Sequence, residues 1–369
     1  MKILIFANSD FGLYRFRKEL IERLSHDHDV TIALPNGEFI DKLSALGCTY
    51  VPIEFNRRGM NPFSDLVLLG MYSRIVRKVK PDIVLTYTIK PNVYGGIACR
   101  MNKVPYIANV TGLGTSIENG GLLCRVTTTL YRIGLRRARC VFFQNKQNLA
   151  LFQDKHIVNG KSRLIPGSGV NLETHNLEEY PSDSDGIRFL FVGRIMKNKG
   201  IDELLSATEL VRNEYPNIHL DIVGGCDEDY NDRLRIAEEV ENACYHGQQS
   251  EIHQFYKNAH CTILPSYHEG TANVMLESAA TGRPIITTRV PGCIETFEEG
   301  ITGFGCDARD VESLADAMKS FLMLTQDEKR NMGLMGREKM IKEYDRSIVI
   351  NAYIEEITAQ KKTLKSGVN

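Results

Sequence analysis

The chain has 369 residues, of which 43% are hydrophobic and 25% are charged, and it contains no tryptophan. This composition is typical of a globular protein large enough for two domains, and it excludes a disordered chain. The sequence has no apolar run of about 18 residues or more, so we expect no membrane-spanning helix. The apolar start MKILIF is too short for a signal peptide, which predicts a cytoplasmic protein.

The charges are unevenly distributed along the chain. Residues 1–170 carry 24 Lys and Arg against 12 Asp and Glu, a net charge of +12, whereas residues 171–369 carry 21 against 34, a net charge of −13. A basic half indicates a domain that faces a polyanion such as nucleic acid, anionic lipid or a phosphorylated substrate. The nine cysteines form no CxxC pair, so the sequence predicts neither a disulfide framework nor a zinc site.

Strand-like segments alternate with amphipathic helical segments in the first half of the chain. This alternation predicts a parallel sheet covered by helices, because right-handed crossovers join parallel strands most simply. We expect strands over 2–7, 30–34, 50–53, 83–87, 104–109 and 140–144, and helices over 16–24, 39–46, 66–79 and 122–137.

The alternation stops in the polar, turn-rich segment 171–186 and then resumes. Strands are expected over 188–192, 218–223, 261–264 and 284–288, and helices over 201–211, 232–241, 251–256 and 274–279. The predicted fold class is therefore α/β, with two doubly wound Rossmann-like domains and a cleft between them. The expected parts are an N-terminal domain (1–170), a linker (171–186), a C-terminal domain (187–345) and a final helical segment (346–369) that returns to the N-terminal domain.

In open α/β sheets, ligands bind at the carboxyl ends of the strands, so the loops after Ala7, Val192, Val223 and Leu264 are the candidate sites. The segment VGRIMKNKG (192–200) places Arg194 and Lys199 after a strand and before a helix, which favours a diphosphate site. Gly193 and Gly200 flank these cations and permit close backbone approach. The alternative is that both cations are solvated loop residues.

A second candidate segment is HEGTANVMLE (268–277), which follows the strand TILP. Its two carboxylates lie eight residues apart, or about 80° around a helix, so both can address one long ligand from the same side. The alternative places Glu277 on the helix surface and lets Glu269 complement the helix dipole. Between the two acids lies an expected helix N-terminus whose amides suit an anion or a sugar hydroxyl, formed by Gly270, Thr271, Ala272 and Asn273.

Together, VGRIMKNKG and EGTANVMLE resemble the retaining glycosyltransferases of family 4, which have the GT-B fold and a Glu-x7-Glu signature. FGLYRFRKELIERL, PGSGVNLE and CYHGQQSEIHQFYKNAHCTILPSYHEG are similar to other segments of that family, so the resemblance covers essentially the whole chain. NPF (61–63), TYTIKPNVYG (86–95) and NVTGLG (109–114) resemble the subgroup that adds sugars to polyprenyl-diphosphate-linked glycans, which includes bacterial GalNAc and galactose transferases.

This resemblance implies a role for each matching residue. Arg194 and Lys199 would hold the donor diphosphate, Glu277 would bind the nucleotide ribose, and Glu269 would contact the donor sugar. The implied donor-binding set further comprises Gly12, Gly193, Gly270, Thr271, Ala272 and Asn273, with the backbone near Gly12 approaching the diphosphate. Asn109 and Thr111 belong to the implied acceptor or sugar loop, where many relatives have a histidine at the position of Thr111.

Two other motifs suggest different chemistry. Asp227-Glu228-Asp229 matches the DxD metal motif of the other large glycosyltransferase fold, but it precedes a helix, and we interpret it as capping that helix. Gly167-Ser168-Gly169 lacks the third glycine of a dinucleotide fingerprint, which disfavours a dehydrogenase.

The predicted function is transfer of a hexose or N-acetylhexosamine from a nucleotide diphosphate, UDP in the first instance, to a lipid-linked glycan of bacterial surface polysaccharide. The resemblance implies retention of configuration, no cofactor, no metal and no nucleic-acid partner. A GT-B nucleotide-sugar epimerase and a non-catalytic sugar-nucleotide-binding protein are the alternatives.

The distribution of basic residues predicts peripheral attachment of the basic half to the cytoplasmic face of an anionic membrane. The cations of this half concentrate in three groups: Arg57 and Arg58; Arg74, Arg77, Lys78 and Lys80; and Arg125, Arg132, Arg136, Arg137 and Arg139. The cations of the third group surround the apolar residues Leu122, Leu123, Val126, Leu130, Ile133 and Leu135. The alternative is an ordinary helix whose apolar stripe is core.

Overall fold

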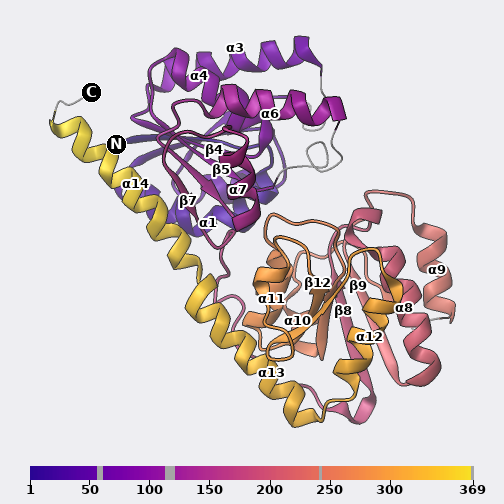
Figure 1. Cartoon of the computed structure of the whole chain (residues 1–369). Coiled ribbons are helices and arrows are strands. Elements are labelled where there is room, and N and C mark those ends of the chain that lie inside the picture. Colours follow the sequence, from indigo (N-terminus) through magenta and orange to yellow (C-terminus); the bar gives the residue numbers. More distant parts are fainter. Residues whose placement is uncertain (56–60, 113–120, 241–242, 367–369) are drawn as a thin grey trace. The chain divides into compact units, whose positions relative to one another are not determined.

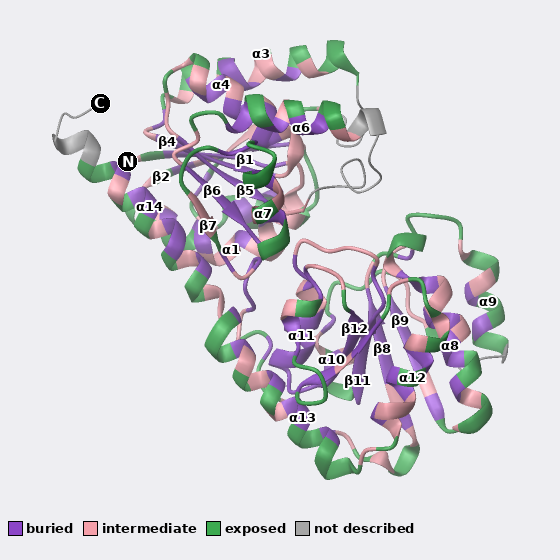
Figure 2. Ribbon diagram, viewed as in Figure 1, coloured by how far each residue is buried: buried purple, intermediate pink, exposed green. Residues whose placement is uncertain are grey.

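The computed structural model describes residues 1–55, 61–112, 121–240 and 243–366. The chain divides into two compact units: Met1–Ser168 with Ser347–Asn369, and Gly169–Arg346 (Figure 1). Residues 171–186, which we expected to be a linker, belong to the second unit. In both units the strands are mostly buried and the helices expose their outer faces (Figure 2). The two Rossmann-like parallel sheets confirm the predicted α/β fold class.

The first unit contains a seven-stranded sheet in the order β3-β2-β1-β4-β5-β6-β7 among the described residues, and every pairing is parallel. Of its central strands, β4 and β5 are buried along their whole length because helices cover both faces. The strands are β1 (Lys2–Phe6), β2 (Asp29–Leu34), β3 (Thr49–Pro52), β4 (Ile83–Tyr87), β5 (Tyr106–Val110), β6 (Cys140–Phe143) and β7 (Ser162–Leu164).

Side-chain caps explain where several helices of this unit begin. Ser9 accepts the Gly12 amide at the start of α1, and Asn61 accepts the Phe63 amide where Pro62 opens α3. The helices are α1 (Asp10–Asp27), α2 (Ile40–Ser44), α3 (Pro62–Val79), a π-helical turn (Pro91–Gly95) running into α4 (Gly96–Met101), α6 (Gly121–Leu135), α7 (Lys146–Asp154) and α14 (Arg346–Ser366).

Helix α14 ends the chain and packs into the core of the first unit. Its buried face is formed by Val349, Ala352, Tyr353 and Ile357, which join the cluster around β1, β2 and α1. The Tyr353 ring lies 4.6 Å from the Phe142 ring of β6, centroid to centroid. This packing explains why Ser347 onward belongs to the first unit although 178 residues of the other unit precede it.

The second unit contains a six-stranded parallel sheet in the order β10-β9-β8-β11-β12-β13 within its described part. The strands are β8 (Ile187–Val192), β9 (Ile218–Val223), β10 (Ala243–Tyr245), β11 (Cys261–Leu264), β12 (Ile285–Thr288) and β13 (Gly303–Cys306). The helices are α8 (Ile201–Glu214), α9 (Asn231–Val240), α10 (His253–Asn258), α11 (Asn273–Ala280), α12 (Val311–Leu322) and α13 (Gln326–Lys339), with a π-helical turn (Met340–Tyr344) after α13.

A buried arginine fastens part of the expected linker to the second unit. The guanidinium of Arg283 is fully buried and donates to the carbonyls of Glu178 and Glu179 as well as to those of Tyr256 and Lys257. Burial lowers the pKa of Arg283 to about 10, so the group stays charged near neutral pH. These hydrogen bonds explain why the polar segment is an ordered part of the unit.

Candidate functional site

Three loops pack backbone against backbone at the carboxyl ends of β8, β9 and β11. Gly200 has a φ of +72°, and a Cβ there would overlap the carbonyl oxygen of Pro265. Gly224 has a φ of +152°, and a Cβ there would overlap the carbonyl oxygen of Gly193. Only glycine combines such a positive φ with the absence of a Cβ, so Gly200 and Gly224 let the loops converge. The convergence brings Arg194, Lys199 and Glu269 to the same edge of the sheet.

Arg194 follows β8, and its guanidinium donates to Asp227 Oδ2 at 2.5 Å. The Arg194 side chain is 55% exposed, so most of this cation faces solvent. Glu228 accepts the Lys197 amide at 2.8 Å, and Asp229 accepts the amide of Asn231, where α9 begins. Our capping interpretation of the acidic triplet is therefore supported for Asp229, whereas Asp227 and Glu228 bond to the loop that carries Arg194.

Lys199 and Glu269 form an ion pair between the loops that follow β8 and β11. Their side chains are only 18% and 15% exposed, so this pair is far less hydrated than a surface pair. Further hydrogen bonds join the loops, since Ser266 Oγ and the Tyr267 amide both donate to the carbonyl of Asn198. The alternative that Lys199 is a freely solvated cation is therefore wrong.

Cys293 lies close enough to this ion pair for its charges to act on the thiol. Burial and, second, the negative charge of Glu269 raise the pKa of Cys293 to about 12, and the charge of Lys199 opposes them only weakly. Cys293 is therefore a neutral thiol at physiological pH and serves here as a core residue.

Glu277 lies on the buried face of α11 and is 4% exposed. The hydroxyl of Tyr256 donates to its Oε2 at 2.9 Å. Because Glu277 is buried, the alternative that it is a surface helix residue is wrong. A buried carboxylate needs hydrogen-bond donors, and the Tyr256 hydroxyl is one of them. The sequence gives no signal for Tyr256, whose partner lies 21 residues further along the chain.

The start of α11 differs from the expectation in one respect. The Ala272 amide donates to the carbonyl of Gly292 at 2.7 Å, so it is not directed at a ligand as we expected. The physical reason is the Pro291-Gly292 turn, which packs against this loop. Asn273 presents a buried Oδ1 that has no hydrogen-bond partner among the described residues, and Gly270 and Thr271 adjoin it in the same loop.

The candidate residues of the first unit have different environments. Gly12 lies in the first turn of α1, where its amide donates to Ser9 Oγ at 3.2 Å, and its assignment to the donor stays a prediction. Asn109 is 1% exposed and bonds to Tyr353, Asn92 and Gln144. Asn109 is thus buried in the core and helps to hold α14, and its assignment to the acceptor or sugar loop stays a prediction. Thr111 follows β5 and is half-buried.

Gly292 offers a test of the loop packing. Its φ is +81°, and a Cβ there would overlap the carbonyl of Glu269, whereas Gly300 has a φ of +71° with open space around it. Gly300→Ala should cost only the left-handed strain of about 1–2 kcal/mol. Gly292→Ala should lower the free energy of unfolding distinctly more than Gly300→Ala does, as measured by urea unfolding. It should also speed hydrogen exchange in residues 268–273, as measured by mass spectrometry. Equal effects of the two variants would contradict this account of the loop.

Two protein-family models match the chain, one in each unit. The model for "Glycosyl transferase 4-like" matches residues 2–145, and the model for "Glycosyl transferases group 1" matches residues 173–339. The second match includes Arg194, Lys199, Glu269 and Glu277.

Similar proteins extend over nearly the whole chain. The N,N'-diacetylbacillosaminyl-diphospho-undecaprenol alpha-1,3-N-acetylgalactosaminyltransferase of Campylobacter jejuni is 24% identical, covering 96% of this chain and 98% of that protein. The capsular polysaccharide biosynthesis glycosyltransferase CapM of Staphylococcus aureus is 25% identical, covering 94% and 93%. The structure of HepE from Anabaena with UDP and glucose superposes with a TM-score of 0.77 at 18% identity, covering 97% and 99%. The N-terminal part of the chain thus matches the 4-like glycosyltransferase model, the C-terminal part matches the group 1 glycosyltransferase model, and the two parallel sheets have the GT-B fold.

Proposed function

We propose that the protein transfers a hexose or N-acetylhexosamine from a nucleotide-diphosphate sugar to a lipid-linked glycan, with UDP as the expected nucleotide. The transfer retains the anomeric configuration and requires no metal. The observation that carries this proposal is the convergence of Arg194, Lys199 and Glu269 at one edge of the second sheet. The similarity to the Campylobacter transferase, whose name specifies a polyprenyl-linked acceptor, supports the choice of acceptor.

The cations suit the departure of a diphosphate. As the bond between the sugar and the diphosphate breaks, negative charge grows on the phosphate oxygens, and fixed cations stabilise that charge without reorganising. Arg194 offers an exposed guanidinium whose orientation Asp227 fixes, and Lys199 offers an ammonium in a poorly hydrated setting. Thr111 supplies no acid at the position where relatives have a histidine, so this stabilisation falls on Arg194 and Lys199.

Retention follows from attack on the face that the diphosphate leaves. The acceptor hydroxyl oxygen bonds to the anomeric carbon as the bond from that carbon to the diphosphate breaks, and the hydroxyl proton passes to the departing phosphate oxygen. Glu269, held by Lys199, orients the donor sugar in this scheme, and Glu277 accepts a hydrogen bond from the ribose. Glu269 is the only carboxylate assigned to the sugar, which favours this route over a covalent glycosyl-enzyme.

A product assay tests the proposal. The protein is incubated with a panel of UDP-sugars and GDP-sugars, a polyprenyl-diphosphate-linked glycan and EDTA, and the product linkage is determined by NMR. We expect transfer from a UDP-sugar with the donor's anomeric configuration, and no epimerised sugar when UDP-GlcNAc is incubated alone. An inverted product, transfer abolished by EDTA, or a glycosylated Glu269 peptide trapped during turnover would overturn the proposed mechanism.

Substitutions should separate the roles of the charged residues. Arg194→Ala and Lys199→Ala should lower kcat more than they raise the donor KM, because the charge that they stabilise grows in the transition state. Glu277→Ala should weaken donor binding by about 1.5–3 kcal/mol, the range for hydrogen bonds to charged groups. Steady-state kinetics and calorimetric titration with the donor measure these effects.

Lys197→Ala is the matched control, because Lys197 is an exposed cation in the same turn as Lys199. It should leave both kinetic constants near those of the parent protein. If Arg194→Ala and Lys199→Ala merely raise the donor KM, the roles assigned to them are wrong. Glu277→Ala also removes the carboxylate that accepts the Tyr256 hydroxyl. The melting temperature of this variant therefore shows whether weaker donor binding reflects a lost ribose contact or a loss of folding.

We further propose that the first unit binds an anionic membrane surface, mainly through α3. One face of this helix exposes Phe63, Leu66 and Val67 at 81%, 66% and 63%. The same face continues into Arg74, Arg77 and Lys78, which are also exposed. Apolar groups beside cations are typical of interfacial helices. None of the helices in the described part of the chain combines the length and the apolar character that a membrane span requires.

Helix α6 contributes charge more than apolar surface. Leu135 is buried and Leu130 is partly buried in the core, so the apolar stripe is largely internal over the described side chains, of which Val126 and Ile133 are exposed. Leu122 and Leu123, like Arg57 and Arg58, lie outside the residues whose side chains are described. Exposed cations lie at Arg125 and Arg132 of α6 and at Arg136 and Arg137 in the turn that follows it.

Vesicle flotation tests the membrane surface. The protein should float with anionic liposomes at low salt, and Phe63→Ser combined with Leu66→Ser should reduce the bound fraction several-fold. Leu164→Ser is the control, because Leu164 is an apolar residue of the same unit that is 43% exposed away from this face. Equal binding to neutral and anionic liposomes, or no effect of the α3 substitutions, would contradict the proposal.

A further inference from the structure

A cysteine, a histidine and an aspartate meet at the edge of the second sheet, away from the loops that carry Arg194 and Glu269. Strand β10 pairs with β9 so that Cys244 lies beside Asp221. Because side chains alternate between the faces of a sheet, His246, two residues after Cys244, projects to the same side. The backbone register thus brings three different metal-ligating groups together.

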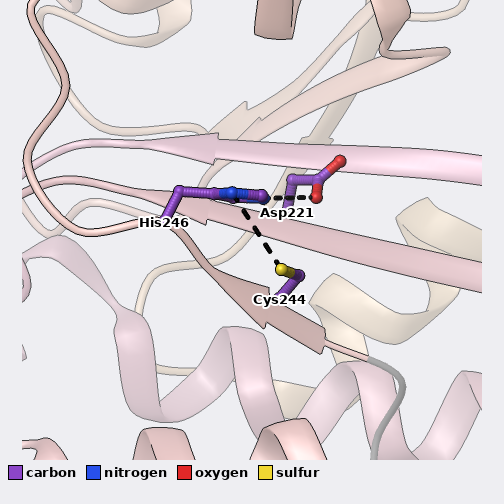
Figure 3. A group of neighbouring side chains, drawn as sticks. All are labelled: Asp221, Cys244 and His246. Carbon is purple, nitrogen blue, oxygen red and sulfur yellow. Dashed lines mark hydrogen bonds and ion pairs between the residues drawn. The ribbon is translucent and has the colours of Figure 1, made fainter.

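The three side chains lie close enough to share one cation. The imidazole of His246 lies between the other two, with Nε2 2.7 Å from Asp221 Oδ1 and Nδ1 4.0 Å from Cys244 Sγ (Figure 3). One ligand atom from each residue lies within 4.8 Å of the other two. Ligand atoms on a tetrahedral zinc ion are about 3.4 Å apart, given metal–ligand bonds of about 2.1 Å. To share one ion, the side chains must rotate, and the imidazole must give up either its hydrogen bond to Asp221 or its contact with Cys244.

The surroundings hold these ligands in place and leave room for a further one. Arg188 donates to Asp221 Oδ2 at 2.9 Å, which leaves Oδ1 for a cation, and the Phe255 ring packs on His246 with centroids 4.8 Å apart. Such outer contacts orient metal ligands. Asp221 and His246 also line a cavity of about 460 Å³, which can supply a water molecule as the fourth ligand.

We propose that Asp221, Cys244 and His246 form a binding site for Zn²⁺ or a similar borderline-soft cation. A thiolate, an imidazole and a carboxylate together suit zinc better than magnesium or calcium, which take only oxygen ligands. The bound ion joins β10, an edge strand of three residues, to β9. The site lies outside the donor-binding residues, so glycosyl transfer remains metal-independent in our account and neither proposal depends on the other.

Cobalt titration of the full-length, metal-stripped protein tests the site. Co²⁺ should produce thiolate-to-cobalt charge-transfer absorption and the intense visible bands of a tetrahedral complex, and one equivalent of Zn²⁺ should displace it. Cys244→Ser should abolish the charge-transfer band, and His246→Ala should weaken Zn²⁺ binding at least tenfold. Zn²⁺ should raise the melting temperature of the parent protein and leave that of Cys244→Ser unchanged.

Cys226→Ser is the matched control, because Cys226, like Cys244, is an exposed cysteine of the second unit. This variant should keep the cobalt spectrum, and circular dichroism should show that each variant is folded. Absence of a charge-transfer band in the parent protein, its survival in Cys244→Ser, or its loss in Cys226→Ser would each overturn the proposal.

Discussion

The candidate site depends on close backbone contacts that only glycine permits. Gly200 lies against the carbonyl of Pro265, Gly224 against that of Gly193, and Gly292 against that of Glu269. Each contact joins loops that follow different strands, so the loops fix one another at the carboxyl edge of the sheet. A side chain at any of these positions would separate them and move the charged groups that they carry.

The ion pair between Lys199 and Glu269 follows from this convergence. Two opposite charges that are both largely withdrawn from water interact more strongly than a surface pair, and removing one leaves the other poorly solvated. The pair therefore does more than add stability, because it fixes the direction of a carboxylate and a cation before any ligand arrives. Arg194 has a different character, since its partner Asp227 holds one end of an otherwise exposed guanidinium whose other N–H groups can still donate.

The sequence predicts what local patterns determine. Strand periodicity places Arg194, Lys199 and Glu269 in loops after strands, and the structure brings them to one edge. The sequence analysis does not predict β7 or β10, whose three residues are too few for a pattern, and its expected elements also omit β13 and the helices α4, α7, α12 and α13. Long-range contacts decide further features: Asn109 bonds to Tyr353 of α14, the turn at Gly292 takes the Ala272 amide, and Tyr256 meets Glu277. Such partners are set by tertiary packing, which no local window of sequence contains.

Helix α10 gives the second unit a physical link between two of its polar clusters. Neighbouring residues of this six-residue helix face different partners: Tyr256 donates to Glu277, and Phe255 packs on His246. The segment after β10 also contacts the glycine-rich loop, because Gly247 accepts the Gly224 amide and Tyr245 donates to the Gly224 carbonyl. These contacts join the segment after β10 to the loop that precedes Asp227, the residue that orients Arg194.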